Sequence, residues 1–71
     1  MNEGERRLCE WWFGASRRSF FGYLFEALAH ADTENLYKIG LGFPLEAAAY
    51  FRYAYEDGYW DNLRHEYGRG I

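Results

Sequence analysis

Valine is absent from this 71-residue chain, and isoleucine occurs only at Ile39 and Ile71. Because β-branched residues favour strands, their depletion argues against a sheet, and the many alanine, leucine, glutamate and arginine residues favour helices. We therefore predict an all-α fold, a compact bundle of four or five short helices in a single domain that spans residues 1–71.

Glycines divide the chain into segments whose apolar residues have helical spacing. Gly14, Gly40, Gly58 and Gly68 each follow such a segment, and each is predicted to stop a helix. Residues 68–71 are expected to form a frayed tail, as chain ends often do. The expected helices cover residues 2–13, 16 or 19 to 31, 34–39, 44–57 and 59–67.

Small polar residues and one proline mark where three of these helices begin. Either Ser16 or Ser19 is expected to be the N-cap of the second helix, and either Asp32 or Thr33 that of the third. Pro44 suits the first position of the fourth helix, where its missing N–H costs nothing.

The chain is near the lower size limit for a domain built around one core. A chain of about 60 residues buries only roughly 60% of its unfolded surface. Cys9 is the only cysteine, so an intramolecular disulfide is excluded. Aromatic residues make up 23% of the chain, and we expect the large area that they bury to stabilise the fold in place of a disulfide. The cysteine usage and the lack of a signal-peptide or membrane-spanning pattern predict a soluble, cytoplasmic protein.

The segment 19–31 has the clearest amphipathic pattern. At about 100° per residue, Phe20, Leu24 and Leu28 share one stripe, whereas Glu26 and His30 lie opposite. We therefore expect this helix to be central, with that stripe in the core.

The segment 44–57 carries both apolar and charged positions. Ala47, Phe51 and Ala54 share one face and are predicted to pack in the core. Tyr53 falls in the opposite, charged arc, so its ring is predicted to be exposed. The charged residues of that arc are Glu46, Arg52, Glu56 and Asp57.

Residues 31–63, ADTENLYKIGLGFPLEAAAYFRYAYEDGYWDNL, carry a recurring order of short motifs. The order is Ala-Asp, Asn-Leu, Gly-Phe-Pro, Ala-Tyr and Tyr-Trp, and it resembles that of short uncharacterised helical proteins encoded by bacteriophages and prophages. The resemblance covers under half of the chain and implies a phage origin. It also implies a modulator of a host machine, such as an inhibitor of a defence-system component in the host cytoplasm.

Few residues suit catalysis or metal binding. Cys9, His30, Asp32 and His65 are the only candidates, and no two of them have a ligand spacing such as CxxC or HxxxH. Cys9 is expected to be a small buried apolar residue. A chain this short also has little room to enclose a ligand. We expect no catalytic residue, no metal, no cofactor and no small-molecule substrate.

The surplus of aromatic residues points to protein–protein contact. Sixteen aromatic residues exceed what four short helices can hide, and exposed Tyr, Trp and Arg dominate binding hot spots. We expect the partner to be a host protein or a second copy in a homodimer, with no membrane contact. The predicted partner-binding residues are Trp11, Arg17, Arg18, Tyr53, Glu56, Asp57 and Tyr59.

A small nucleic-acid-binding protein is the alternative interpretation. Arg6, Arg7, Arg17 and Arg18 can contact phosphates, and nearby aromatic residues can stack on bases. However, the net charge of -3 is far from the strongly basic surface of such proteins. The composition therefore favours a protein partner.

Overall fold

The computed structural model describes residues 1–15 and 18–69 of the chain. Within these ranges the backbone is helical with no strand, which confirms the predicted all-α, single-domain fold. No helix in this part of the chain is long and apolar enough to cross a membrane. The helices are α1 (Glu3–Trp12), α2 (Phe20–His30), α3 (Thr33–Gly42), α4 (Pro44–Tyr55) and α5 (Tyr59–Arg69).

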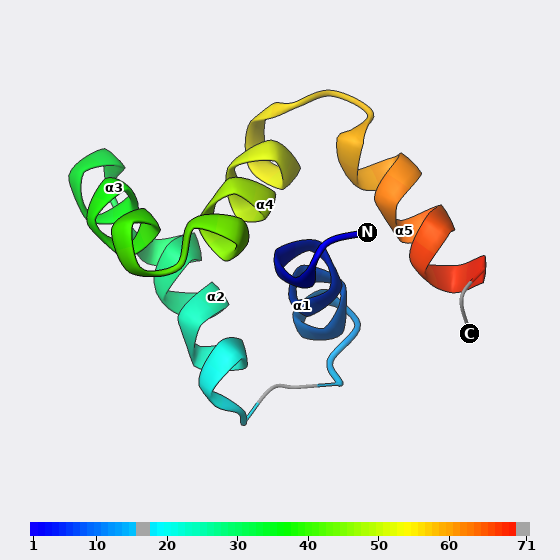
Figure 1. The fold of residues 1–71 in the computed structure, drawn as a ribbon, viewed down its shortest axis with the longest axis horizontal. Coiled ribbons are helices and arrows are strands. Elements are labelled where there is room, and N and C mark those ends of the chain that lie inside the picture. Colours follow the sequence, from blue (N-terminus) through cyan, green and yellow to red (C-terminus); the bar gives the residue numbers. More distant parts are fainter. Residues whose placement is uncertain (16–17, 70–71) are drawn as a thin grey trace.

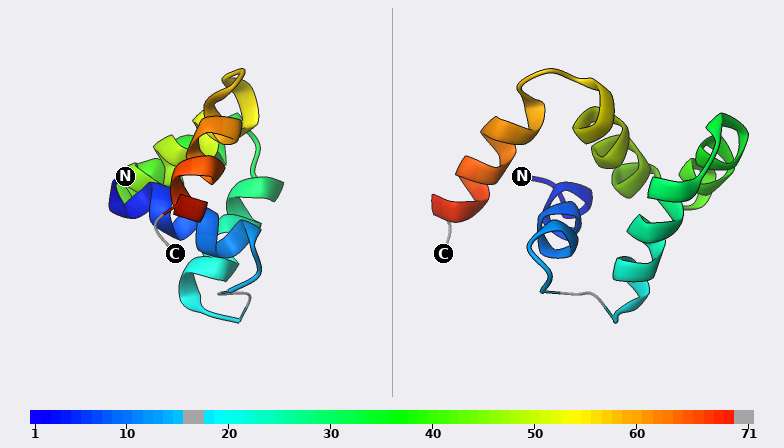
Figure 2. Two further views of the ribbon diagram at one scale, coloured as in Figure 1. Left: turned by 90° about the vertical axis from the view of Figure 1, so that its right-hand side faces the viewer. Right: turned by 180° about the vertical axis from the view of Figure 1, so that it is seen from behind.

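Helix α1 lies at the centre of the fold and is seen nearly end-on in Figure 1. Helices α2, α4 and α5 are arranged around it, and each of them contacts it. Helix α3 packs on α4, on the outer side of the bundle. The rear view in Figure 2 places α2 and α5 on opposite sides of α1. The radius of gyration is 11.5 Å, close to the roughly 11 Å expected of a compact domain of this length.

Both ends of α1 are stabilised by local hydrogen bonds. Asn2 and Glu5 form a capping box, in which each side chain accepts a hydrogen bond from the backbone N–H of the other at 2.8 to 2.9 Å. At the other end Gly14 adopts the left-handed region, with φ of 83°. The N–H of Ala15 then donates to the carbonyl of Glu10 at 2.9 Å, as in a Schellman motif. The predicted stop at Gly14 is thus confirmed.

The N-caps of α2 and α3 are Ser19 and Asp32. Each side chain accepts a hydrogen bond from the backbone N–H three residues later, at 3.1 Å for Ser19 and 2.8 Å for Asp32. Thr33, the other candidate for α3, is instead the first residue of the helix. Ser16, the other candidate for α2, lies outside the described residues. Pro44 is the first residue of α4, as predicted.

Of the other glycines predicted to end helices, only Gly58 lies between two helices, and α4 already ends at Tyr55 with Glu56 as its C-cap, before the predicted end at residue 57. Gly58 has a φ of 81° and lies in the turn between α4 and α5. Gly40 and Gly68 are inside α3 and α5, so the predictions for them were wrong, as was the short third helix. A Cβ at Gly40 would lie 3.5 Å from the Cβ of Ala47, an ordinary van der Waals distance, so Gly40 faces α4 without being required for the contact. The predicted frayed tail is helical at residues 68 and 69, and residues 70–71 lie outside the described residues.

The core is small and rich in rings. Helices α1, α2, α4 and α5 all contribute buried side chains, and partly buried aromatic residues surround them. The buried hydrophobic residues are Leu8, Cys9, Phe25, Leu28, Ala47, Ala49, Tyr59 and Leu63.

The tightest approach between two helices joins α1 to the start of α4. Gly4 lies directly on the backbone of Leu45 and Glu46, where a Cβ atom would overlap the carbonyl group of Leu45. Close by, Arg7 Nε lies 3.7 Å from a carboxylate oxygen of Glu46, whose side chain is buried. The guanidinium of Arg7 also stacks 3.5 Å above the ring centre of Phe21 in α2. This contact therefore connects three helices.

The buried face of α2 differs from the predicted one. Phe20 is 62% exposed and Leu24 only half-buried, whereas Phe25 and Leu28 are fully buried. The helix is therefore turned by roughly one residue, or about 100°, from the predicted orientation. Apolar side chains occur on nearly every side of α2, so shape complementarity with α1 decides which of them are buried.

Helix α4 is turned by a similar amount, which makes the predictions for four of its residues wrong. Ala54, predicted to be in the core, is exposed. Phe51 is 53% exposed instead of buried. Tyr53 is half-buried instead of exposed, because it packs edge-on against Trp11 and Trp60. Glu46, predicted to face solvent, is buried beside Arg7. The physical reason is the close contact with α1, which places this side of α4 inward.

Replacement of Phe25 by Ala tests the observed orientation of α2, because Phe25 is fully buried but lies outside the stripe that was predicted to be in the core. We expect Phe25→Ala to lower the free energy of unfolding by about 3–5 kcal/mol, the usual cost of deleting a buried phenylalanine side chain. Phe20→Ala is the matched control, because Phe20 belongs to the predicted stripe but is 62% exposed, and its effect should be much smaller than that of Phe25→Ala. Urea denaturation measures both. Equal effects would show that the face of α2 assigned to the core is wrong.

The Gly4 contact is tested by adding a single methyl group. Gly4→Ala should lower the free energy of unfolding by about 1–3 kcal/mol, since α1 and α4 must separate to admit the Cβ. Gly68→Ala adds the same group to α5, where no atom lies within 4 Å of it. That variant should be stabilised by up to about 1 kcal/mol through helix propensity alone. Thermal denaturation of the pair checks this, and stabilisation by Gly4→Ala would contradict the packing described.

Candidate functional site

The structure divides the predicted partner-binding residues between two hollows. Trp11, Arg18 and Tyr53 line the first. Glu56, Asp57 and Tyr59 line the second, on the other side of α4's C-terminal end. Arg17 lies outside the described residues. The first hollow, called the aromatic pocket below, is lined by Trp11, Trp12, Arg18, Tyr23, Glu26 and Tyr53.

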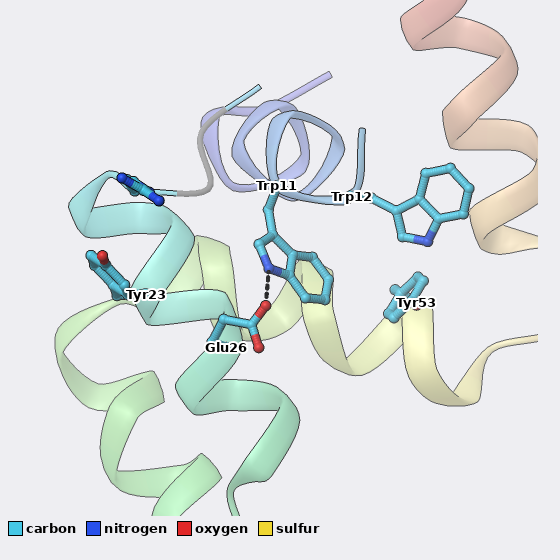
Figure 3. A pocket seen from close by; sticks show the side chains of 6 residues that line it. Trp11, Trp12, Tyr23, Glu26 and Tyr53 are labelled. Atoms are coloured by element: carbon cyan, nitrogen blue, oxygen red, sulfur yellow. Dashed lines mark hydrogen bonds between the residues drawn. The ribbon is translucent and has the colours of Figure 1, made fainter. Parts of the chain in front are cut away.

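The aromatic pocket is an open hollow of about 580 Å³ where α1, α2 and α4 meet. This volume is within the range of ordinary ligand sites. Figure 3 shows Trp11 in the middle, with Tyr23 on one side and Trp12 and Tyr53 on the other. Four of its six lining residues are aromatic, and the other two carry opposite charges.

Trp11 is held in place from several directions. Its ring stacks on Phe25 with a centroid distance of 5.6 Å, and the ring of Tyr53 meets it edge-on at 6.3 Å. Its indole N–H donates to Glu26 Oε1 at 3.1 Å (Figure 3). Because these contacts come from α2 and α4, the ring position is set by tertiary packing.

Aromatic contacts continue from the pocket towards α5. Tyr53 and Trp12 both contact Trp60 of α5, with centroid distances of 5.3 and 5.1 Å. Further along, Phe13 stacks on Tyr67 at 5.5 Å. Trp12 nevertheless stays 43% exposed at the pocket. The rings therefore stabilise the fold and also present an apolar surface to solvent.

The two charged residues of the pocket differ from Arg6 and Arg7 of α1 in their ion pairing. Glu26 and Arg18 are exposed, and neither makes an ion pair with a described residue. In contrast, Arg6 pairs with Glu3 and with Glu10, the latter at 3.1 Å. Arg7 pairs with Glu3 at 2.8 Å and lies against Phe21. Two of the arginines expected for nucleic-acid binding are therefore already engaged within the fold.

The second hollow has a volume of about 290 Å³ and several acidic side chains. Glu56 is paired with Arg52 at 2.8 Å, and the guanidinium of Arg52 lies 4.1 Å above the ring centre of Tyr59. The hydroxyl of Tyr59 donates to Glu5 Oε2 at 2.6 Å. Asp57 is exposed. Tyr59, predicted to bind a partner through an exposed ring, is buried and joins α5 to α1 instead.

The Tyr59–Glu5 hydrogen bond shifts both groups. Burial, followed by the hydrogen bond to Glu5, raises the pKa of Tyr59 well above its usual range. Partial burial alone would raise the pKa of Glu5, but the hydrogen bonds from Tyr59 and from the Asn2 backbone outweigh it and lower that pKa. Glu5 is therefore stabilised in its ionised form.

The residues considered for catalysis or metal binding do not come together. Cys9 is fully buried, and burial raises its pKa to about 11, so the thiol is protonated at neutral pH. Within residues 1–15 and 18–69, no three His, Cys, Asp or Glu side chains are placed to hold a metal ion. His30 and His65 are both exposed.

Two residues of the aromatic pocket were absent from the predicted site, namely Tyr23 and Glu26. Both belong to α2, three positions apart, so they share a helix face. Glu26 was predicted to lie opposite the core, no prediction was made for Tyr23, and both side chains are exposed. Sequence alone does not indicate that Trp11 of α1 reaches this face, because that contact depends on how the two helices cross.

The Tyr59–Glu5 hydrogen bond can be tested by Tyr59→Phe. At pH 7 we expect this change to lower the free energy of unfolding by about 1–2 kcal/mol, as for loss of a hydrogen bond to a charged group. The pKa of Glu5 is lowered in the folded state, so its contribution is complete above the unfolded-state pKa of about 4.3 and is lost as pH falls through the folded pKa. The difference between the two proteins should shrink over that acidic interval.

The control for this measurement is Tyr55→Phe, which removes a hydroxyl from an exposed tyrosine of α4. Its stability should match that of the unmodified chain at every pH. A Tyr59→Phe difference that stayed constant down to pH 2 would show that Glu5 is not the group involved.

Comparison with known proteins adds no family to this description. No family model, curated protein or solved structure matches the chain. The resemblance to phage-encoded proteins therefore stays a prediction, and the function of the aromatic pocket has to be inferred from its own residues.

Proposed function

We propose that this protein is a non-catalytic protein-interaction module and that the aromatic pocket and its rim form the contact surface. The observation that carries the proposal is the exposure of Trp12 and Tyr23, 43% and 62%, beside the exposed Arg18. Tryptophan, tyrosine and arginine are the residue types that dominate binding hot spots. Rigid rings also lose little conformational entropy when a partner covers them.

The distribution of apolar residues supports a covered surface. In the described part of the chain, more large hydrophobic residues are exposed than are buried in the core. Part of this exposed apolar area, at Trp12 and Tyr23, lies in the pocket beside Arg18 and Glu26, and apolar area next to polar groups is typical of protein contact sites.

The proposed partner is a host protein that the chain inhibits. This part of the proposal comes from the resemblance of residues 31–63 to phage-encoded proteins. Self-association is the other protein-contact possibility. The nucleic-acid alternative has less support, because Arg6 and Arg7 are engaged with acidic residues of α1 and α4.

Substitution of one exposed tyrosine tests the proposed surface. We expect Tyr23→Ala to weaken binding of the partner that co-purifies with the tagged protein from a bacterial host lysate by more than about 1 kcal/mol. Its stability should change by less than about 0.5 kcal/mol. Tyr37→Ala is the matched control, since Tyr37 of α3 is 69% exposed and lies outside the pocket. That variant should bind as the unmodified chain does.

The same purification is repeated after nuclease treatment and with light scattering to measure the mass in solution. A protein partner that survives nuclease and is lost only with Tyr23→Ala supports the proposal. Loss of all bound material with nuclease would favour the nucleic-acid alternative. A dimer that Tyr23→Ala dissociates would assign the surface to a second copy of the chain.

A further inference from the structure

We infer that the aromatic pocket binds a guanidinium group, the side chain of an arginine presented by the protein partner. The inference deepens the proposed function and rests on it, because an arginine side chain reaches the pocket as part of a larger protein. The pocket offers the two features that such a group requires, namely ring faces and a carboxylate.

The rings supply the first feature. Trp11, Trp12, Tyr23 and Tyr53 line the pocket, and a cation is attracted to the face of such rings, most strongly to tryptophan. Guanidinium is planar and weakly hydrated, so it stacks on a ring with less loss of solvation than a lysine ammonium.

The fold already contains this interaction twice. The guanidinium of Arg7 lies 3.5 Å from the ring centre of Phe21, and that of Arg52 lies 4.1 Å from the ring centre of Tyr59. In each case a carboxylate accompanies the stack, with Glu46 near Arg7 and Glu56 bound to Arg52. The aromatic pocket has the ring and the carboxylate of this arrangement, and its own Arg18 neither stacks on a ring nor pairs with Glu26 among the described residues.

Glu26 supplies the second feature. Its Oε1 accepts the indole N–H of Trp11, so the carboxylate is held beside that ring (Figure 3). Glu26 makes no ion pair with any described residue. Its second oxygen can therefore accept a charge-assisted hydrogen bond from a guanidinium that stacks on the rings.

Arg18 repels a cation in the pocket, so removal of its charge tests whether the bound group is positive or negative. Arg18 lines the same pocket, is exposed and makes no ion pair with a described residue. Its repulsion is weakened by solvent and salt. Removal of its charge should nevertheless strengthen the binding of a cation and would weaken that of an anion.

The second, acidic hollow is a poorer site for the same group. Glu56 is already bound to Arg52, and Glu5 accepts the hydroxyl of Tyr59. Glu66 lies 3.5 Å from the N-terminal ammonium. An incoming arginine would have to displace these partners, whereas Glu26 has no cation to displace.

The experiment is a titration followed by NMR at the indole N–H of Trp11, whose resonance is identified by its loss in Trp11→Phe. The probe is N-acetylarginine amide, and the neutral control is N-acetylcitrulline amide, which has nearly the same shape. We expect saturable binding of the arginine probe with a Kd of roughly 1 mM or above, as for a single small group. The citrulline compound should bind at least about fivefold more weakly, in line with the loss of the cation–π attraction.

Three variants complete the test. Glu26→Gln keeps an acceptor for Trp11 but removes the charge, and it should weaken arginine binding about threefold, within the range of exposed charge pairs. Arg18→Gln should strengthen binding by up to about threefold for the same reason. Tyr37→Ala, outside the pocket, should have no effect.

Any of four results would overturn the inference. These are equal binding of the two compounds, binding that does not saturate, an unchanged affinity of Glu26→Gln for the arginine probe, and a weaker affinity of Arg18→Gln for it.

These outcomes are separable from failure of the proposed function. If Tyr23→Ala loses the partner protein while arginine does not bind, the interaction module stands and only the arginine site fails. If arginine binds and no protein partner is retained, the proposed function fails and the site remains.

Discussion

The contact of Gly4 with the backbone at the start of α4 is the constraint on which the rest of the structure depends. It brings α1 and α4 closer than any side chain would allow, and it sets which faces of both helices meet. Arg7 consequently reaches the buried Glu46 and stacks on Phe21 of α2. These packing contacts, and not a disulfide, hold helix α1 at the centre of the bundle.

The aromatic pocket follows from the same arrangement. Once α1 lies between α2 and α4, Trp11 at its C-terminal end packs against Phe25 and Tyr53 and bonds to Glu26. Trp12, one residue further on, points towards Trp60 and remains partly exposed. In a domain this small, the rings that close the core are also those that reach the surface, so stability and recognition share the same residues.

Local signals predicted the helices well and their faces poorly. The caps at Ser19 and Asp32 and the proline at position 44 depend on hydrogen bonds and backbone geometry within four residues, so these three helix starts could be derived from the sequence. The buried faces of α2 and α4 could not, because both helices carry apolar residues on most sides and the hydrophobic effect has no direction of its own. Gly40 was misinterpreted because a glycine inside a helix has the same sequence signature as one that ends a helix.

Composition and local spacing determined that this chain is helical, where most of its helices begin, and that rings replace a disulfide in its core. They also singled out Trp11, Arg18 and Tyr53, which the fold brings to one pocket. Only the tertiary structure decided that Tyr53 is packed, that Phe51 is exposed, and that Tyr23 and Glu26 complete the pocket. The reason is that helix propensity and capping act over a few neighbouring residues, whereas the direction a side chain faces depends on where backbones can approach, which here is decided at Gly4.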